Sequence, residues 1–74
     1  MKAKTHYTNS ELTRFAIEDQ LRDALHAQKL IASGELTEGA IAIERKYAED
    51  CLRRANAMAG RELSPREIDA ILAL

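Results

Sequence analysis

The sequence predicts an all-α protein with three helices, at about residues 8–33, 38–59 and 65–73. A helix-start pattern occurs three times, each with an apolar residue before a Thr or Ser cap, and apolar residues recur at helical spacing between these starts. We expect a long antiparallel helical hairpin followed by a short C-terminal helix, and we expect this fold to be dimeric or bound to a partner. Residues 1–7 should form a flexible N-terminus and residues 8–74 a single helical domain.

The first helix begins with a complete set of start signals. Thr8 is the predicted N-cap, because its hydroxyl can accept a hydrogen bond from an amide of the first turn. Glu11 is the reciprocal acid of a capping box, and Tyr7 and Leu12 have the spacing of a hydrophobic staple.

The second and third helices begin in the same way. Thr37 is the second cap, without a box acid, and Ser64 is the third cap, with Glu67 as its box acid. Pro65 stands at the first helical position, where no amide hydrogen is needed. Residues 40–43, Ala-Ile-Ala-Ile, also fit a short strand, but they lie between a cap and a run of helix formers, so we favour helix.

Glycines close the first two helices. Gly34 and Gly60 each follow a helical run and can adopt the left-handed backbone conformation that ends a helix. The turns that follow are short, so the first two helices should be antiparallel neighbours.

The second helix has one apolar and one charged face. On the charged face acids and bases alternate four residues apart, which contributes roughly 0.2–0.5 kcal/mol per pair. Cys51 lies on the apolar face, where we expect a buried thiol rather than a nucleophile. The apolar stripe consists of Ile41, Ala48, Cys51, Leu52, Ala55, Met58 and Ala59.

The first helix is apolar over about half of its circumference. The second helix can cover one side of it. The rest must face the helix at 65–73, a second copy of the chain or another protein, and we favour an intermolecular contact because a helix of about ten residues covers little area. The apolar arc consists of Ala16, Ile17, Leu21, Ala24, Leu25, Ala27, Ile31 and Ala32.

Composition and charge argue against several functional classes. The net charge is −1, from 11 basic and 12 acidic residues, so no field of one sign attracts nucleic acid or anionic lipid. No stretch approaches the roughly 20 apolar residues of a membrane span, and the N-terminus lacks the apolar region of a signal peptide. The single cysteine suits a reducing compartment, so we expect a cytoplasmic protein without a membrane contact.

The sequence also lacks the pattern of a catalytic or metal site. His6 and His26 are expected at the surface, far from each other. No zinc-ligand spacing, phosphate-binding loop or nucleophile with a nearby base is present. We therefore expect no enzyme activity, no cofactor, no metal and no small-molecule substrate.

A dimeric helix-turn-helix repressor is the main alternative. The second helix, the turn at Gly60 and the third helix could form that motif. A reading helix normally offers Arg, Lys, Asn or Gln to base edges, whereas the third helix offers Arg66 followed by Glu67 and Asp69. Nucleic acid is therefore the less favoured partner.

Two segments resemble the VbhA-type antitoxins that inhibit Fic-domain AMP-transferases. The segments are residues 22–30, Arg-Asp-Ala-Leu-His-Ala-Gln-Lys-Leu, and residues 60–64, Gly-Arg-Glu-Leu-Ser. The resemblance implies an inhibitory helix with a Ser or Thr, then a Glu four positions later and a Gly or Asn. The corresponding positions here are Ala27, Ile31 and Ala32, so the inhibitory acid is absent.

We therefore predict a small non-enzymatic regulatory or inhibitory protein, of the kind that phages, plasmids or toxin–antitoxin loci encode. It should act by docking an apolar helix face on a protein partner or on a second copy of itself. A structural helical-hairpin subunit is a further alternative. The residues predicted to line the contact are Ile17, Leu21, Leu25, Ile31, Ile68, Ile71 and Leu74.

Overall fold

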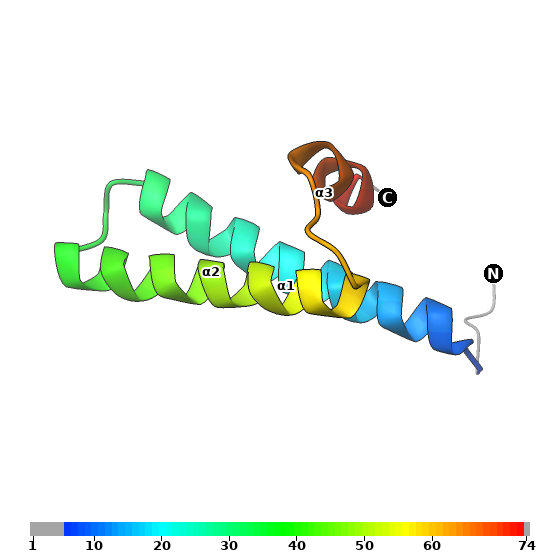
Figure 1. Cartoon of the computed structure of the whole chain (residues 1–74). Coiled ribbons are helices and arrows are strands. Elements are labelled where there is room, and N and C mark those ends of the chain that lie inside the picture. Colours follow the sequence, from blue (N-terminus) through cyan, green and yellow to red (C-terminus); the bar gives the residue numbers. More distant parts are fainter. Residues whose placement is uncertain (1–5, 74) are drawn as a thin grey trace.

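The computed structural model describes residues 6–73, which form three helices and no strand (Figure 1). Helix α1 spans Asn9–Ala32, α2 spans Glu38–Ala59 and α3 spans Pro65–Leu72. The predicted all-α class is confirmed, and each predicted helix end agrees with the structure to within one residue. Residues 40–43 are helical, so the strand alternative is wrong.

The predicted caps form at all three helix starts. Thr8 Oγ1 accepts a hydrogen bond from the Glu11 amide at 3.1 Å, and Glu11 Oε1 accepts one from the Thr8 amide at 3.2 Å. Ser64 and Glu67 form the same reciprocal pair at 3.2 and 3.3 Å. Thr37 accepts a hydrogen bond from the amide of the third residue of α2. These bonds satisfy amide groups that would otherwise lack an intrahelical partner.

An aromatic contact at the start of α1 was not predicted from the sequence. The ring of Tyr7 packs edge to face against Phe15, with ring centroids 5.1 Å apart. The staple between Tyr7 and Leu12 stays a prediction. Leu12 is 50% exposed. The first turns of α1 run past the end of α2, so no neighbouring helix orders these side chains (Figure 1). Residues 1–5 of the predicted flexible N-terminus lie outside the described residues.

The contact between α1 and α2 is made of small side chains. Alanines and one cysteine allow two helix backbones to approach closely, at the cost of little buried apolar area per residue. Leu21 and Cys51 are the largest side chains that are fully buried in the described part of the chain. We call this contact the alanine seam; it consists of Ala24, Ala27, Ala48, Cys51 and Ala55.

A short, well-anchored turn places α3 on one side of the hairpin. Gly60 ends α2 in the left-handed conformation, with φ 72°. The side-chain carbonyl of Asn56 then accepts a hydrogen bond from the Leu63 amide at 3.0 Å. Leu63 is 7% exposed and packs with Leu21 and Ala55, so the turn is anchored in the core just before α3 begins.

Only some of the ion pairs that the four-residue spacing predicts on the charged face of α2 are formed. Lys46 and Asp50 form the expected pair at 3.5 Å, and Arg53 joins the same carboxylate at 3.0 Å. Arg54, also four residues from Asp50, instead donates a hydrogen bond to Gln20 of α1 at 2.9 Å. Its position beside the alanine seam allows the long side chain to cross to the neighbouring helix.

The resulting molecule is elongated. Its radius of gyration is 14.3 Å, whereas a compact chain of the same length has about 11 Å. The principal extents are 43, 30 and 19 Å. A rod of this kind leaves a larger part of its helices uncovered than a compact bundle does.

Two glycine substitutions should change stability in opposite directions. Gly60→Ala should lower the free energy of unfolding by about 1 kcal/mol, because an L-residue is strained at its positive φ. Gly39→Ala should raise it by about 0.4–1 kcal/mol, because Gly39 lies in the first turn of α2 and an added Cβ meets nothing within 4 Å. Urea denaturation monitored by circular dichroism measures both values, and the same sign for both variants would contradict the assigned turn.

Candidate docking surface

Helix α3 is too short to cover the side of the hairpin on which it lies. Its 8 residues extend about 12 Å, whereas the 24 residues of α1 extend about 36 Å. Figure 1 shows α3 over one part of the hairpin, with bare helix toward the hairpin tip and toward the N-terminus. An apolar groove therefore lies on each side of α3.

The groove toward the hairpin tip has a volume of about 490 Å³. Its floor is formed by Leu25 and Leu52, and one wall by Ile68 and Leu72 of α3. We call it the tip groove. It borders a shallower hollow of about 280 Å³, which extends between α1 and α2 toward the tip. Gln28 and Leu52 line both, so the two form one continuous strip.

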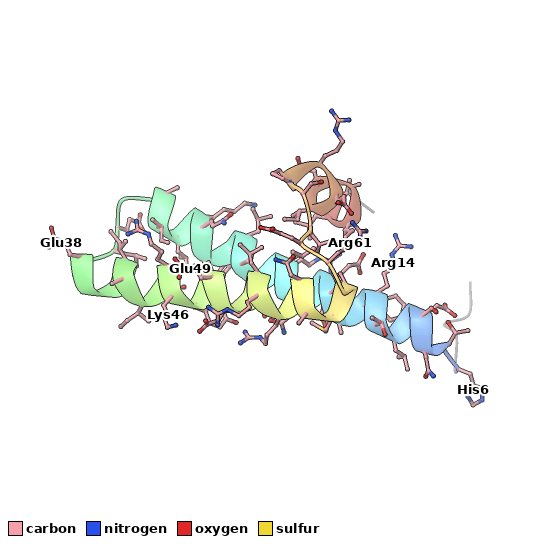
Figure 2. The ribbon with its side chains drawn as sticks, viewed as in Figure 1. His6, Arg14, Glu38, Lys46, Glu49 and Arg61 are labelled. Atoms are coloured by element: carbon pink, nitrogen blue, oxygen red, sulfur yellow. The ribbon has the colours of Figure 1, made fainter. Side chains whose placement is uncertain are left out.

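The second groove lies between the N-terminal part of α1, the end of α2 and α3. It has a volume of about 460 Å³. Two arginines, Arg14 and Arg61, line it. Its apolar residues are Ile17 of α1, Met58 and Ala59 of α2, Leu63 of the turn and Ile71 of α3. We call it the N-terminal groove. Figure 2 shows both arginines at the same end of the molecule, opposite the hairpin tip where Glu38 lies.

The six described residues of the predicted contact all lie on the α3 side of the hairpin. The structure places them in three adjacent hollows, and Leu74 lies outside the described residues. Leu21 is 1% exposed and belongs to the core that supports the tip groove, so a partner could reach little of it. Binding by these residues stays a prediction. Leu21, Leu25 and Ile68 line the tip groove, Ile31 lines the adjoining hollow, and Ile17 and Ile71 line the N-terminal groove.

Some residues of this surface were not predicted from the sequence. Leu52 fitted the stripe assigned to the hairpin contact, and the structure shows it packed in that core while also lining the tip groove. Leu72 stands four residues after Ile68, a helical spacing that could have identified it. Arg14 and Arg61 carried no sequence signal, because only the fold brings them to one groove.

Exposed apolar residues elsewhere are scattered. Ile43 is 71% exposed near the hairpin tip and Tyr47 is 44% exposed on α2. Leu12 and Phe15 lie on the N-terminal turns of α1, and Tyr7 lies just before that helix. These side chains line none of the three hollows. Single exposed apolar residues are normal in proteins and identify no binding site by themselves.

Residues 6–73 contain no group of three His, Cys, Asp or Glu side chains that could hold a metal ion. The Cys51 thiol is fully buried and His26 is exposed on α1. None of the helices in this part of the chain combines the length and apolarity needed to cross a bilayer. Helix α3, the candidate DNA-reading helix, exposes Pro65, Arg66, Asp69 and Ala70.

A polar contact joins α1 and α2 on the side away from α3. The Tyr47 hydroxyl donates a hydrogen bond to Asp23 at 3.3 Å. The pKa of Tyr47 is raised above its ordinary value of 10.0, chiefly by a side-chain hydrogen bond with Cys51, and further by electrostatic interaction with Cys51 and Asp23. The contact therefore favours the protonated phenol in the folded protein.

The ionisation of Tyr47 should weaken the folded state at alkaline pH. Because its pKa is higher in the folded than in the unfolded chain, its contribution to stability is complete below pH 10.0 and is lost as the pH rises through the folded pKa. Tyrosinate absorbance of the wild type, minus that of Tyr47→Phe, should titrate with a midpoint above 10.0. A midpoint at or below that value would contradict the described contact.

Comparisons with protein families, curated proteins and solved structures found no match for this chain. The two segments that resemble VbhA-type antitoxins fall on α1 and on the turn before α3. The position of the family's Ser or Thr is Ala27, which is 1% exposed and buried in the alanine seam.

Proposed function

We propose that this chain is a small non-enzymatic regulatory or inhibitory protein that acts by docking the α3 side of its hairpin onto a protein partner or a second copy. The observation that carries this proposal is the pair of apolar grooves beside α3. Grooves of this kind between helices are common docking sites for apolar side chains of a partner helix.

The amount of exposed surface supports the proposal. A compact monomer of 8.3 kDa exposes about 4,600 Å², whereas this chain exposes 5757 Å². The difference exceeds the roughly 800 Å² that each partner loses in a standard protein–protein interface. A docking event of standard size would therefore bury an area comparable to this surplus.

The kind of side chain on this surface also supports docking. Leu25 is 37% exposed although it lies directly beside core residues. Ile31, Ile68 and Leu72 are each half-buried, so they contact the chain on one side and water on the other. Their transfer from water to an apolar partner would contribute about 25 cal/mol per Å². Among the described residues that line the grooves, no nucleophile stands beside a positioned base, which favours a binding role over a catalytic one.

Leu25→Asp should abolish association, because it places a carboxylate in the tip groove, where a partner would have to desolvate it. The matched control is Leu12→Asp. Leu12 also lies on α1 and is 50% exposed, but it stands 13 positions away at about 100° per residue, roughly on the opposite side of the helix. The control should associate as the wild type does.

The measurement has two arms. Light scattering with sedimentation equilibrium detects a dimer, and capture from a lysate of the source cells detects a different protein. Circular dichroism establishes that both variants remain helical. Equal association by Leu25→Asp and Leu12→Asp, or a clean monomer that captures nothing, would contradict docking through the α3 side. A gel shift at low salt that depends on Arg66 would instead favour the repressor alternative.

A further inference from the structure

The two grooves beside α3 differ in charge. The tip groove is lined by Asp69, and its adjoining hollow by Arg45 and Glu49, so both signs are present. The N-terminal groove is lined by Arg14 and Arg61 and by no acidic residue. The same apolar surface therefore has a basic rim at one end only.

The two arginines of the N-terminal groove differ in whether their charge is paired. Arg61 pairs with Glu67 of α3, so part of its charge is already compensated. Arg14 is exposed on α1, and within residues 6–73 it forms neither a salt bridge nor a hydrogen bond, even though Glu18 follows it by four positions. An unpaired guanidinium beside an apolar floor is suited to a carboxylate that a partner brings with its apolar side chains.

We infer that the N-terminal groove binds an acidic amphipathic segment of another protein. Its apolar side chains would lie against Ile17, Leu63 and Ile71, and a carboxylate would reach Arg14. The inference rests on the proposed docking function and names the chemistry of the partner. Specificity would come from the charge, because the apolar floor alone accepts any side chains of suitable size.

A second copy of the chain is a poorer occupant. A symmetric contact, groove against groove, would bring the arginines of both copies together, and these repel one another. To supply a carboxylate beside apolar side chains, a second copy could instead insert the side of its own α1 that faces away from the groove, where Leu12 and Phe15 are exposed and Asp19 follows Phe15 by four positions. A contact between two different patches of identical chains does not close on itself and generates an open filament unless it forms a ring. A nucleic acid would meet the two arginines but would leave the apolar floor without a partner.

The test uses peptides selected from a random library displayed on phage, with the full-length chain as immobilised bait. We expect the enriched peptides to carry apolar residues at helical spacing with Asp or Glu beside them. Their affinity should fall about tenfold in Arg14→Glu and should weaken as salt is raised. The matched control, Arg22→Glu, should stay within about twofold of the wild type, because Arg22 is exposed on α1, unpaired, and outside the groove.

Five results would overturn the inference. Enriched peptides without carboxylates, an equal loss in both charge-reversal variants, or no enrichment at all would each exclude a groove that selects acidic segments. Self-association of the wild type that Arg14→Glu disperses would assign the groove to a second copy. Peptides that lose binding in Leu25→Asp but not in Arg14→Glu would exclude the N-terminal groove while leaving the proposed docking function intact. Circular dichroism of each variant establishes that the fold is retained.

Discussion

The alanine seam between α1 and α2 is the constraint on which the rest of the structure depends. Small side chains let the two long helices approach closely, but they bury little apolar area for the length of helix they join. The larger core contacts are made around Leu21 and Leu63, where the turn before α3 meets the hairpin. The molecule therefore has a narrow core, and its larger apolar side chains lie near or at the surface.

The short third helix determines how that surface is divided. Because α3 crosses only one part of the hairpin, it converts a single apolar side into two grooves instead of covering it. Its own isoleucines are shared, since Ile68 lines the tip groove and Ile71 the N-terminal groove. The placement of α3 by Asn56 and Leu63 thus controls both sites at once, and any loosening of that turn would reshape them together.

The helices could be predicted from the sequence because each start has its own local signal. Thr8, Thr37 and Ser64 satisfy nearby amides, and such bonds depend on residues only three positions apart. The apolar arc of α1 likewise predicted which side of the hairpin remains partly bare. Neither signal depends on how distant segments meet.

The division of the site into two grooves could not be predicted, because it depends on the position and crossing of α3. Arg14 and Arg61 are 47 positions apart in the sequence, and the antiparallel hairpin together with the turn at Gly60 brings them to the same groove. The contact of Tyr7 with Phe15 was not predicted either, because the staple pattern considers only Leu12, five positions after Tyr7. The spacing within α2 predicts Asp50 as the partner of Arg54, because a spacing within one helix carries no information about residues of the neighbouring helix such as Gln20.

The position of Cys51 gives the chain an internal reporter. Its sulfhydryl is the single one in the sequence, is completely shielded within the alanine seam, and lies 3.4 Å from the guanidinium of Arg54. An alkylating reagent can reach that sulfur only when α1 and α2 separate, so its rate of reaction measures how often the two helices part. A partner that holds the two helices together would slow this reaction without contacting the sulfur. Local opening of the native hairpin can thus be followed without any added label.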